Sequence, residues 1–384
     1  MMKIRKSLSV IVFTGIICVL TAHADPAPVS IKELPKQTTS KWQQAYQAYG
    51  RTVDVDVDIY IPDADTAPVI TVQAAPPIPE PRNGELAKEY KSMDRKDKVN
   101  SFIFESTDYW TYIQHAIPPE WGKTKKDEFY AHKMWENAFD LPRYDENQAY
   151  AYKNKITVRE AFEITQNHIL EFFPDIELHL DTIYIGGETY YRKNNQHISK
   201  MGCYNLNTNQ VFHKIPFSAG IHDTFSDRLE CEPNWDTDLK GTVFAEVYSD
   251  NAWLLAARLY QETGIVCEDI PLLPFDAVKD QVETLILKGY VRWVNSVTLG
   301  YVQYETSNPR EQVLLPSWVV WCEYHPDGPS GEAAYGVNDS EMMFDGNNPY
   351  YMPLIFNAQT GEMIDPANTA EDRYMCPDLS AWKK

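Results

Sequence analysis

The sequence lacks the short motifs that mark the common enzyme sites. It contains no G-x-S-x-G, no P-loop and no G-x-G-x-x-G, so it does not indicate a nucleophile-elbow hydrolase, a P-loop nucleotide-binding protein or a dinucleotide-binding protein. The zinc-protease pattern H-E-x-x-H is absent. There is also no C-x-x-C, which argues against a thioredoxin-type redox centre and a zinc ribbon. We therefore assign no catalytic residue and no cofactor.

Basic residues are scarce relative to acidic ones. The chain has 35 Lys and Arg against 55 Asp and Glu, so its formal charge at pH 7 is 35 − 55 = −20. Such a surface repels phosphate backbones and anionic lipid headgroups, which argues against nucleic acid as a partner. The hydrophobic fraction of 43% and the charged fraction of 23% are typical of a globular chain.

Long hydrophobic runs are missing beyond the N-terminus. Basic residues within positions 1–6 precede the apolar run Leu8–Leu20, and a small-residue site ends at Ala24. This pattern is typical of a secretory signal peptide cleaved after Ala24, and the run is too short for a transmembrane helix. Cys18 is not expected to carry lipid, because the bulky Ile17 precedes it. We expect a secreted or otherwise extracytoplasmic protein with no integral membrane span after signal removal.

The cysteine count after that cleavage is odd, which leaves at least one thiol unpaired. We expect structural cysteines with one disulfide at most, and the spacing does not select a pair. The five are Cys203, Cys231, Cys267, Cys322 and Cys376.

The N-terminal part indicates strands. Residues 53–60 alternate Val or Ile with Asp, which predicts a half-buried strand, and residues 69–72 are expected to form its return strand. Trp42, Tyr46 and Tyr49 are expected to share one face of a short helix. The proline-rich stretch 74–82 is interpreted as an extended linker.

Two longer helices are predicted, each followed by strands. Thr157 and Glu160 form a capping box at the start of a helix over 157–173, and a second helix over about 275–288 ends at Gly289. Short helices are also expected near 84–93 and 126–139. The strands expected after the two longer helices lie at 182–185, 189–192, 201–204, 210–215, 297–304, 313–324, 350–356 and 362–364.

The sequence also shows an internal echo. Residues 204–212 and 356–364 both have an aromatic residue, Asn, two variable residues, Thr, and then Asn209 or Gly361. Because Asn and Gly adopt a positive φ at low cost, we expect a tight hairpin turn at each. The echo favours a duplicated unit of one helix and an antiparallel sheet.

These segments resemble a known family. The hairpin at 356–365 and the preceding Leu315–Trp321 resemble the closing strands of PepSY-type and cystatin-like domains. The wider arrangement is similar to a family of bacterial secreted proteins and lipoproteins described only as a domain of unknown function. The resemblance implies a structural or binding protein outside the cell membrane and transfers no catalytic residue. The other matching pieces are residues 53–62, 157–173, 263–265 and 272–276.

Several acidic and histidine residues were weighed as metal ligands. On a strand, Asp54, Asp56 and Asp58 lie about 6.6 Å apart in turn, so they are expected to solvate its outer face rather than to share one calcium ion. His213 and His222 are interpreted as structural or surface residues. The loop over 325–349 supplies weak calcium candidates, because a loop can wrap around an ion. They are Asp339, Glu341 and Asp345.

Aromatic residues are abundant, with 10 Trp and 24 Tyr. We interpret most of them as core, including Trp318 and Trp321, although exposed aromatic rings also suit glycan stacking and protein interfaces.

The sequence thus predicts an α+β fold of two PepSY/cystatin-like units, each a helix packed on an antiparallel sheet, plus an N-terminal strand segment. The expected boundaries are 1–24 for the signal peptide, 25–83 for the strand segment and linker, and 84–230 and 231–384 for the two units. The expected function is non-catalytic binding of an extracellular protein, peptide or glycan, including a cell-wall component. Two alternatives remain open, a secreted hydrolase supported by calcium and, by cystatin-like analogy, a protease inhibitor.

Overall fold

We describe the fold from a computed structural model, which covers residues 27–75, 101–104, 111–115, 129–137, 147–149, 156–192, 197–219, 241–248, 253–305, 312–324 and 351–364. Within these residues the chain forms three helices and sixteen strands. The helices are α1 (Leu34–Gln37), α4 (Val158–Phe172) and α6 (Asp276–Leu287). The strands are β1 (Lys41–Ala48), β2 (Arg51–Tyr60), β3 (Val69–Ala74), β4 (Ser101–Phe104), β5 (Thr111–His115), β6 (Phe129–Asn137), β7 (Glu177–Arg192), β8 (His197–Phe212), β9 (Ile215–Ala219), β10 (Thr242–Tyr248), β11 (Trp253–Arg258), β12 (Tyr260–Cys267), β13 (Val291–Glu305), β14 (Gln312–Tyr324), β15 (Tyr351–Asn357) and β16 (Met363–Ile364).

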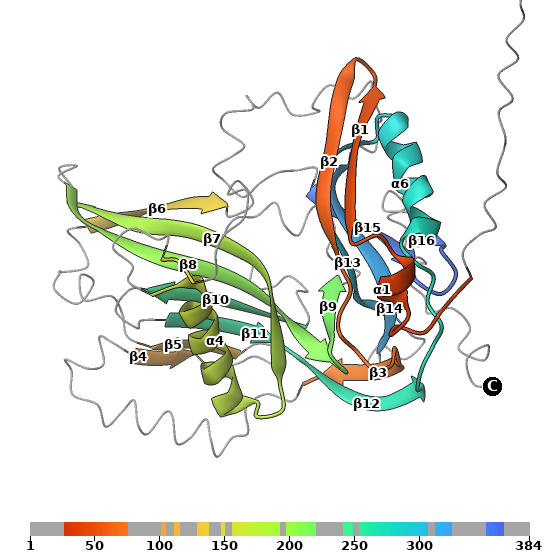
Figure 1. The fold of residues 1–384 in the computed structure, drawn as a ribbon. Coiled ribbons are helices and arrows are strands. Elements are labelled where there is room, and N and C mark those ends of the chain that lie inside the picture. Colours follow the sequence, from red (N-terminus) through yellow and green to blue (C-terminus); the bar gives the residue numbers. More distant parts are fainter. Residues whose placement is uncertain are drawn as a thin grey trace, which may run out of the picture.

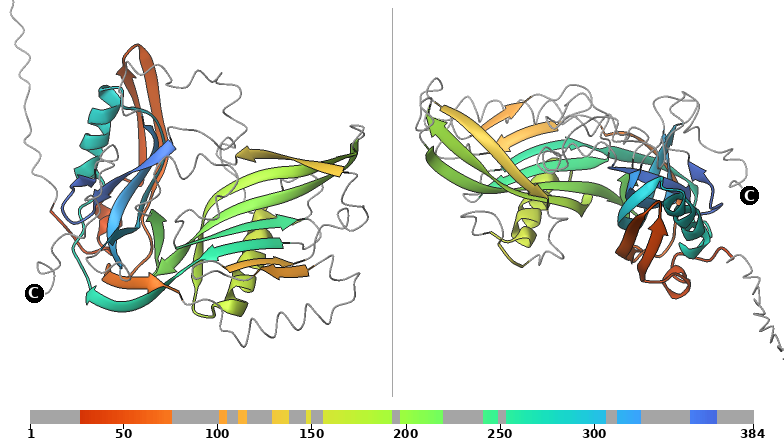
Figure 2. Two further views of the ribbon diagram at one scale, coloured as in Figure 1. Left: turned by 180° about the vertical axis from the view of Figure 1, so that it is seen from behind. Right: turned by 90° about the horizontal axis from the view of Figure 1, so that it is seen from above.

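Seven strands form a curled antiparallel sheet, which we call the half-barrel. Its strand order is β6-β7-β8-β10-β11-β5-β4. The sixteen-residue strands β7 and β8 pair with each other along most of their length. Helix α4 lies against one face of this sheet, and the outer strands curl away from it (Figures 1 and 2).

The remaining strands build a second sheet with the order β12-β3-β14-β13, in which β15 and β16 continue from β14. The β1–β2 hairpin joins this sheet through a short parallel pairing of β2 with β13. Helix α6 lies alongside the hairpin and β13 (Figure 1). The second sheet and its neighbours therefore form a second lobe beside the half-barrel.

Helix α4 confirms the predicted helix over 157–173. The Thr157 hydroxyl accepts a hydrogen bond from the Glu160 backbone N–H at 3.1 Å, and the Glu160 carboxylate accepts one from the Thr157 N–H at 2.6 Å. These two bonds satisfy N–H groups that a helix start otherwise leaves without partners. The apolar stripe of α4 then packs on β7, β8 and β10 in the smaller core, where Val158, Ala161 and Ile169 are fully buried.

Helix α6 confirms the predicted helix over 275–288, and Gly289 follows it with φ +79°. Its start is fixed by a chain of aromatic rings across the larger core. The ring of Phe275 lies 5.8 Å from that of Trp42 on β1 and 5.4 Å from that of Trp318 on β14. The indole N–H of Trp318 donates to the Leu273 carbonyl at 2.9 Å. The interpretation of Trp318 and Trp321 as core residues is confirmed, since both are buried.

Strand β9 connects the two sheets. It pairs antiparallel with β8 and parallel with β13, next to Gly300. A Cβ at Gly300 would lie 2.6 Å from the Ser218 Cβ and 2.9 Å from the Pro216 carbonyl oxygen. Because real Cβ atoms do not approach other atoms so closely, only glycine lets β9 cross β13 at this point.

The predicted α+β fold of two helix-on-sheet PepSY/cystatin-like units is wrong. The protein is mostly β-sheet and contains the curled half-barrel instead. Strands β10 and β11 come after residue 230 yet pair with β8 and β5 in the half-barrel, and β9 joins that sheet to the other one. An apolar pattern indicates that a strand is present, but the strand's partner is selected by tertiary packing.

The N-terminal prediction is right for β2 and wrong around it. Strand β2 alternates as expected, with Asp54, Asp56 and Asp58 on the exposed face. Residues 41–48, however, form strand β1 and not a helix. A four-residue spacing puts Trp42 and Tyr46 on one face of a strand as well as of a helix, so the pattern did not distinguish them. Strand β3 is not the return strand of β2, because it pairs with β12 and β14.

Other local predictions have mixed outcomes. The helix expected near 126–139 is wrong over its described part, where residues 129–137 form β6 and pair with β7. The helix expected near 84–93 lies outside the described residues. Gly361 has the expected positive φ of 73°, but Asn209 lies inside β8. The turn that follows β8 instead uses His213 and Lys214, with φ values of 50° and 66°. The hairpins at 297–324 and 350–364 are confirmed by β13–β14 and β15–β16.

Candidate functional site

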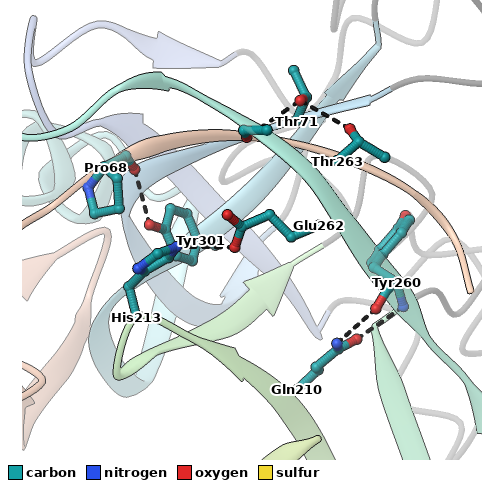
Figure 3. Close-up of polar contacts among 9 residues, drawn as sticks. Pro68, Thr71, Gln210, His213, Tyr260, Glu262, Thr263 and Tyr301 are labelled. Atoms are coloured by element: carbon teal, nitrogen blue, oxygen red, sulfur yellow. Dashed lines mark hydrogen bonds and ion pairs between the residues drawn. The ribbon is translucent and has the colours of Figure 1, made fainter. Parts of the chain in front are cut away.

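Strand β12 lies where the half-barrel meets the second sheet, and it is the edge strand of that sheet. One side of β12 pairs with β3. Its other side faces the end of β8, from which Gln210 and His213 reach toward it (Figure 3). We call the polar residues gathered here the junction site. They are Gln210, His213, Tyr260, Glu262, Tyr301 and Gln303.

Gln210 acts on β12 as a neighbouring strand would. Its side-chain N–H donates to the Tyr260 carbonyl at 2.8 Å, and its side-chain oxygen accepts from the Tyr260 backbone N–H at 2.9 Å. Both residues are buried. One amide side chain therefore hydrogen-bonds both the backbone donor and the backbone acceptor of Tyr260.

The turn between β8 and β9 holds the two lobes together through both of its residues. His213 Nε2 lies 2.9 Å from a carboxylate oxygen of Glu262 on β12. Lys214 Nζ lies 3.5 Å from a carboxylate oxygen of Asp65, in the connection between β2 and β3. A positive φ costs free energy in residues other than glycine, so these contacts hold a turn that the backbone alone disfavours.

Two tyrosines lie near the contact between His213 and Glu262 (Figure 3). The Tyr301 hydroxyl donates to the Pro68 carbonyl at 2.9 Å, and the Tyr260 hydroxyl donates to the side-chain oxygen of Gln303. Burial raises the pKa of the Tyr301 phenol well above its usual range, and the Glu262 carboxylate adds to that rise. The Tyr301 hydroxyl is therefore a neutral hydrogen-bond donor at physiological pH.

The polar groups of the junction site are engaged in contacts with one another and with neighbouring backbone. The side chains of His213 and Glu262 are 32% and 33% exposed, so solvent reaches the pair. The hydroxyl protons of Tyr260 and Tyr301 are both used in other hydrogen bonds. Among the residues that the structure describes, no three His, Cys, Asp or Glu side chains gather as they would around a metal ion.

The candidate residues predicted from the sequence are not brought together here. The calcium candidates Asp339, Glu341 and Asp345 lie outside the described residues, as does Ala24 at the expected cleavage site. Of the five cysteines, Cys267 is a free thiol and Cys203 and Cys322 are buried, and the other two, Cys231 and Cys376, fall in stretches not covered. His213 is the one candidate ligand found at the junction site, and it contacts Glu262.

Sequence reasoning did not single out Gln210, Tyr260, Glu262 or Tyr301. They come from three strands far apart in the chain, and no short spacing links them. One local signal was available, the glycine in Thr263-Gly264-Ile265, because a glycine inside a strand often marks a bulge. The pairing of β12 with β3 does shift register at that point.

Comparison with known proteins supports the fold alone. No protein-family model and no curated protein matches the chain. A crystal structure of an uncharacterized protein from Eubacterium rectale is similar, with a TM-score of 0.50 and 13% sequence identity over 87% of this chain and 97% of that one. In the described part of the chain, no helix has both the length and the apolar character needed to cross a membrane.

Proposed function

We propose that this is a non-catalytic binding protein that acts outside the cytoplasm, and that the edge of strand β12 at the junction site is where it binds a protein or peptide ligand. The observation that carries the proposal is that β12 ends a sheet and that, within the described residues, Gln210 covers its outer edge at Tyr260 and not beyond. Location outside the cytoplasm rests on the predicted signal peptide.

The geometry of the junction site supports binding over catalysis. The Tyr260 hydroxyl donates to Gln303 and the His213 imidazole contacts Glu262, and both contacts hold β12. The Tyr301 hydroxyl holds Pro68 at the start of β3, the strand that pairs with β12. A held strand edge is a rigid surface, and rigid surfaces bind with little loss of conformational freedom. Ligand sites also occur preferentially where two structural units meet.

The experiment is selection of ligands from a displayed library of random peptides against the full chain, followed by hydrogen exchange with the best peptide. We expect peptides to be enriched and the amides of residues 260–267 to be protected on binding. The amides of residues 41–48 in β1, on the far side of the second lobe, serve as the control and should not change. Protection confined to other segments would contradict the location, and turnover of peptide or glycan substrates would contradict the non-catalytic role.

A further inference from the structure

The edge of β12 that faces away from β3 has an identifiable set of backbone groups. The Leu259 carbonyl accepts from the Ala75 N–H at 2.8 Å, so by the alternation of an antiparallel pair Tyr260 and Glu262 direct their backbone groups away from β3. Ile265 lies opposite Ile70, a residue whose backbone groups face β14. The backbone N–H and C=O of Ile265 therefore also point away from β3. The edge therefore presents donors and acceptors at Tyr260, Glu262 and Ile265.

Only the first of these positions is covered within the described residues. The side-chain amide of Gln210 binds both backbone groups of Tyr260 and so occupies the place of a strand there. The backbone groups of Glu262 and Ile265 have no such partner in the part of the chain that the structure describes. A strand lying in line with the Gln210 amide would meet them in turn.

The side chains of β12 are not of the kinds that commonly block the pairing of an edge strand. Free edges are commonly protected by Lys or Pro, and β12 contains neither. The side chains of Gln261, Thr263 and Ile265 are exposed, and Ile265 is a β-branched apolar residue at 49% exposure. Ile265 thus offers an apolar contact to a neighbouring strand.

The negative charge beside the β12 edge favours a basic segment as its binding partner. Glu262 lies on β12, and Glu268 and Asp269 directly follow its end. His213 contacts Glu262, and Lys214 is engaged with Asp65, so Glu268 and Asp269 add negative charge beside the edge. The whole chain carries a formal charge of −20, so a second copy of it would be repelled. A segment with Lys or Arg residues is attracted for the same reason.

We infer that β12 binds an extended basic segment of a partner protein by strand addition, with β-branched apolar residues of that segment alternating with Lys or Arg. The inference rests on the proposed function and names the partner of the same site. Main-chain hydrogen bonds to Glu262 and Ile265 supply affinity, and the acidic surroundings supply preference for a basic segment.

The test uses the full chain and synthetic peptides in isothermal titration calorimetry. The probe is a peptide of alternating Val and Lys, which should bind. The same peptide with N-methyl groups on the residues of one edge loses backbone donors but keeps its side chains, so its affinity should fall about tenfold or more. A Val and Glu peptide should not bind. Ile265→Lys should weaken binding of the basic peptide about tenfold.

The matched control is Leu287→Lys at the end of α6, where the replaced side chain is also apolar and 53% exposed. It adds the same charge away from β12 and should leave the affinity unchanged. Equal binding of the N-methylated peptide would overturn strand addition while leaving peptide binding intact. If the Val and Lys peptide does not bind while the random library still yields binding peptides, the inference is overturned and the proposed function stands. Peptide-sensitive dimers in sedimentation would assign the edge to a second copy instead and would also overturn it.

Discussion

Replacing Gln210 by leucine tests the most distinctive contact of the molecule. The Gln210 amide is the partner of both backbone groups of Tyr260, at 2.8 and 2.9 Å, and both residues are buried. Leucine has nearly the same bulk but no donor or acceptor. The change therefore keeps the packing and removes both hydrogen bonds that the amide makes with the Tyr260 N–H and C=O.

The expected cost follows from those two groups. A buried donor or acceptor that loses its partner costs about 1–3 kcal/mol, so two of them cost about 2–6 kcal/mol. The added apolar surface of leucine offsets roughly 1 kcal/mol of this. We expect Gln210→Leu to lower the free energy of unfolding by about 1–5 kcal/mol.

The assay is urea denaturation followed by tryptophan fluorescence, with the dependence on urea compared between variants. Gln73→Leu on the exposed face of β3 is the matched control, because its amide makes only a 3.5 Å contact with Gln261. Its effect should stay within about 0.5 kcal/mol. A Gln210→Leu loss no larger than that of the control would refute the reasoning that Gln210 stands in for a strand.

Four further outcomes follow from the described contacts. Thr157→Ala should lower the free energy of unfolding by about 1 kcal/mol through loss of the α4 cap, measured in urea, with an unchanged stability as the contrary result. Gly300→Ala should cost about 1–3 kcal/mol, because its methyl group meets β9; a neutral effect would show that β9 can shift. Burial lowers the pKa of His179, and nearby carboxylates offset only part of that shift. The contribution of His179 to the free energy of unfolding should therefore be full well above about pH 6.5 and should fall below that pH, because the unfolded chain takes up the proton first. His179→Phe should flatten that part of the profile of stability against pH, and an unaltered profile would contradict the assignment. Complete burial raises the pKa of the Cys322 thiol, so iodoacetamide should label the partly exposed Cys267 before Cys322 in the native protein. Mass spectrometry reads the labelling, and equal labelling rates at the two cysteines would argue against the burial of Cys322.

The sequence alone was enough wherever one residue and its near neighbours decide the outcome. The capping box at Thr157 and Glu160 fixes the start of α4, because both hydrogen bonds form within four residues. The alternation in β2 identifies a strand and its exposed face, since side chains of a strand point to opposite sides in turn. Gly289 ends α6 through its own backbone freedom.

The tertiary structure alone decided which strands pair and what lies at the junction site. Trp42 and Tyr46 carry a spacing that suits a helix or a strand, and pairing with β2 selects the strand. Tyr260 lies 50 residues from Gln210 and 43 from Gln303, so no local pattern links them. The physical reason is the range of the forces involved. Caps and turns are local interactions, whereas the choice of a strand's neighbour depends on which surfaces are buried once the whole chain has folded.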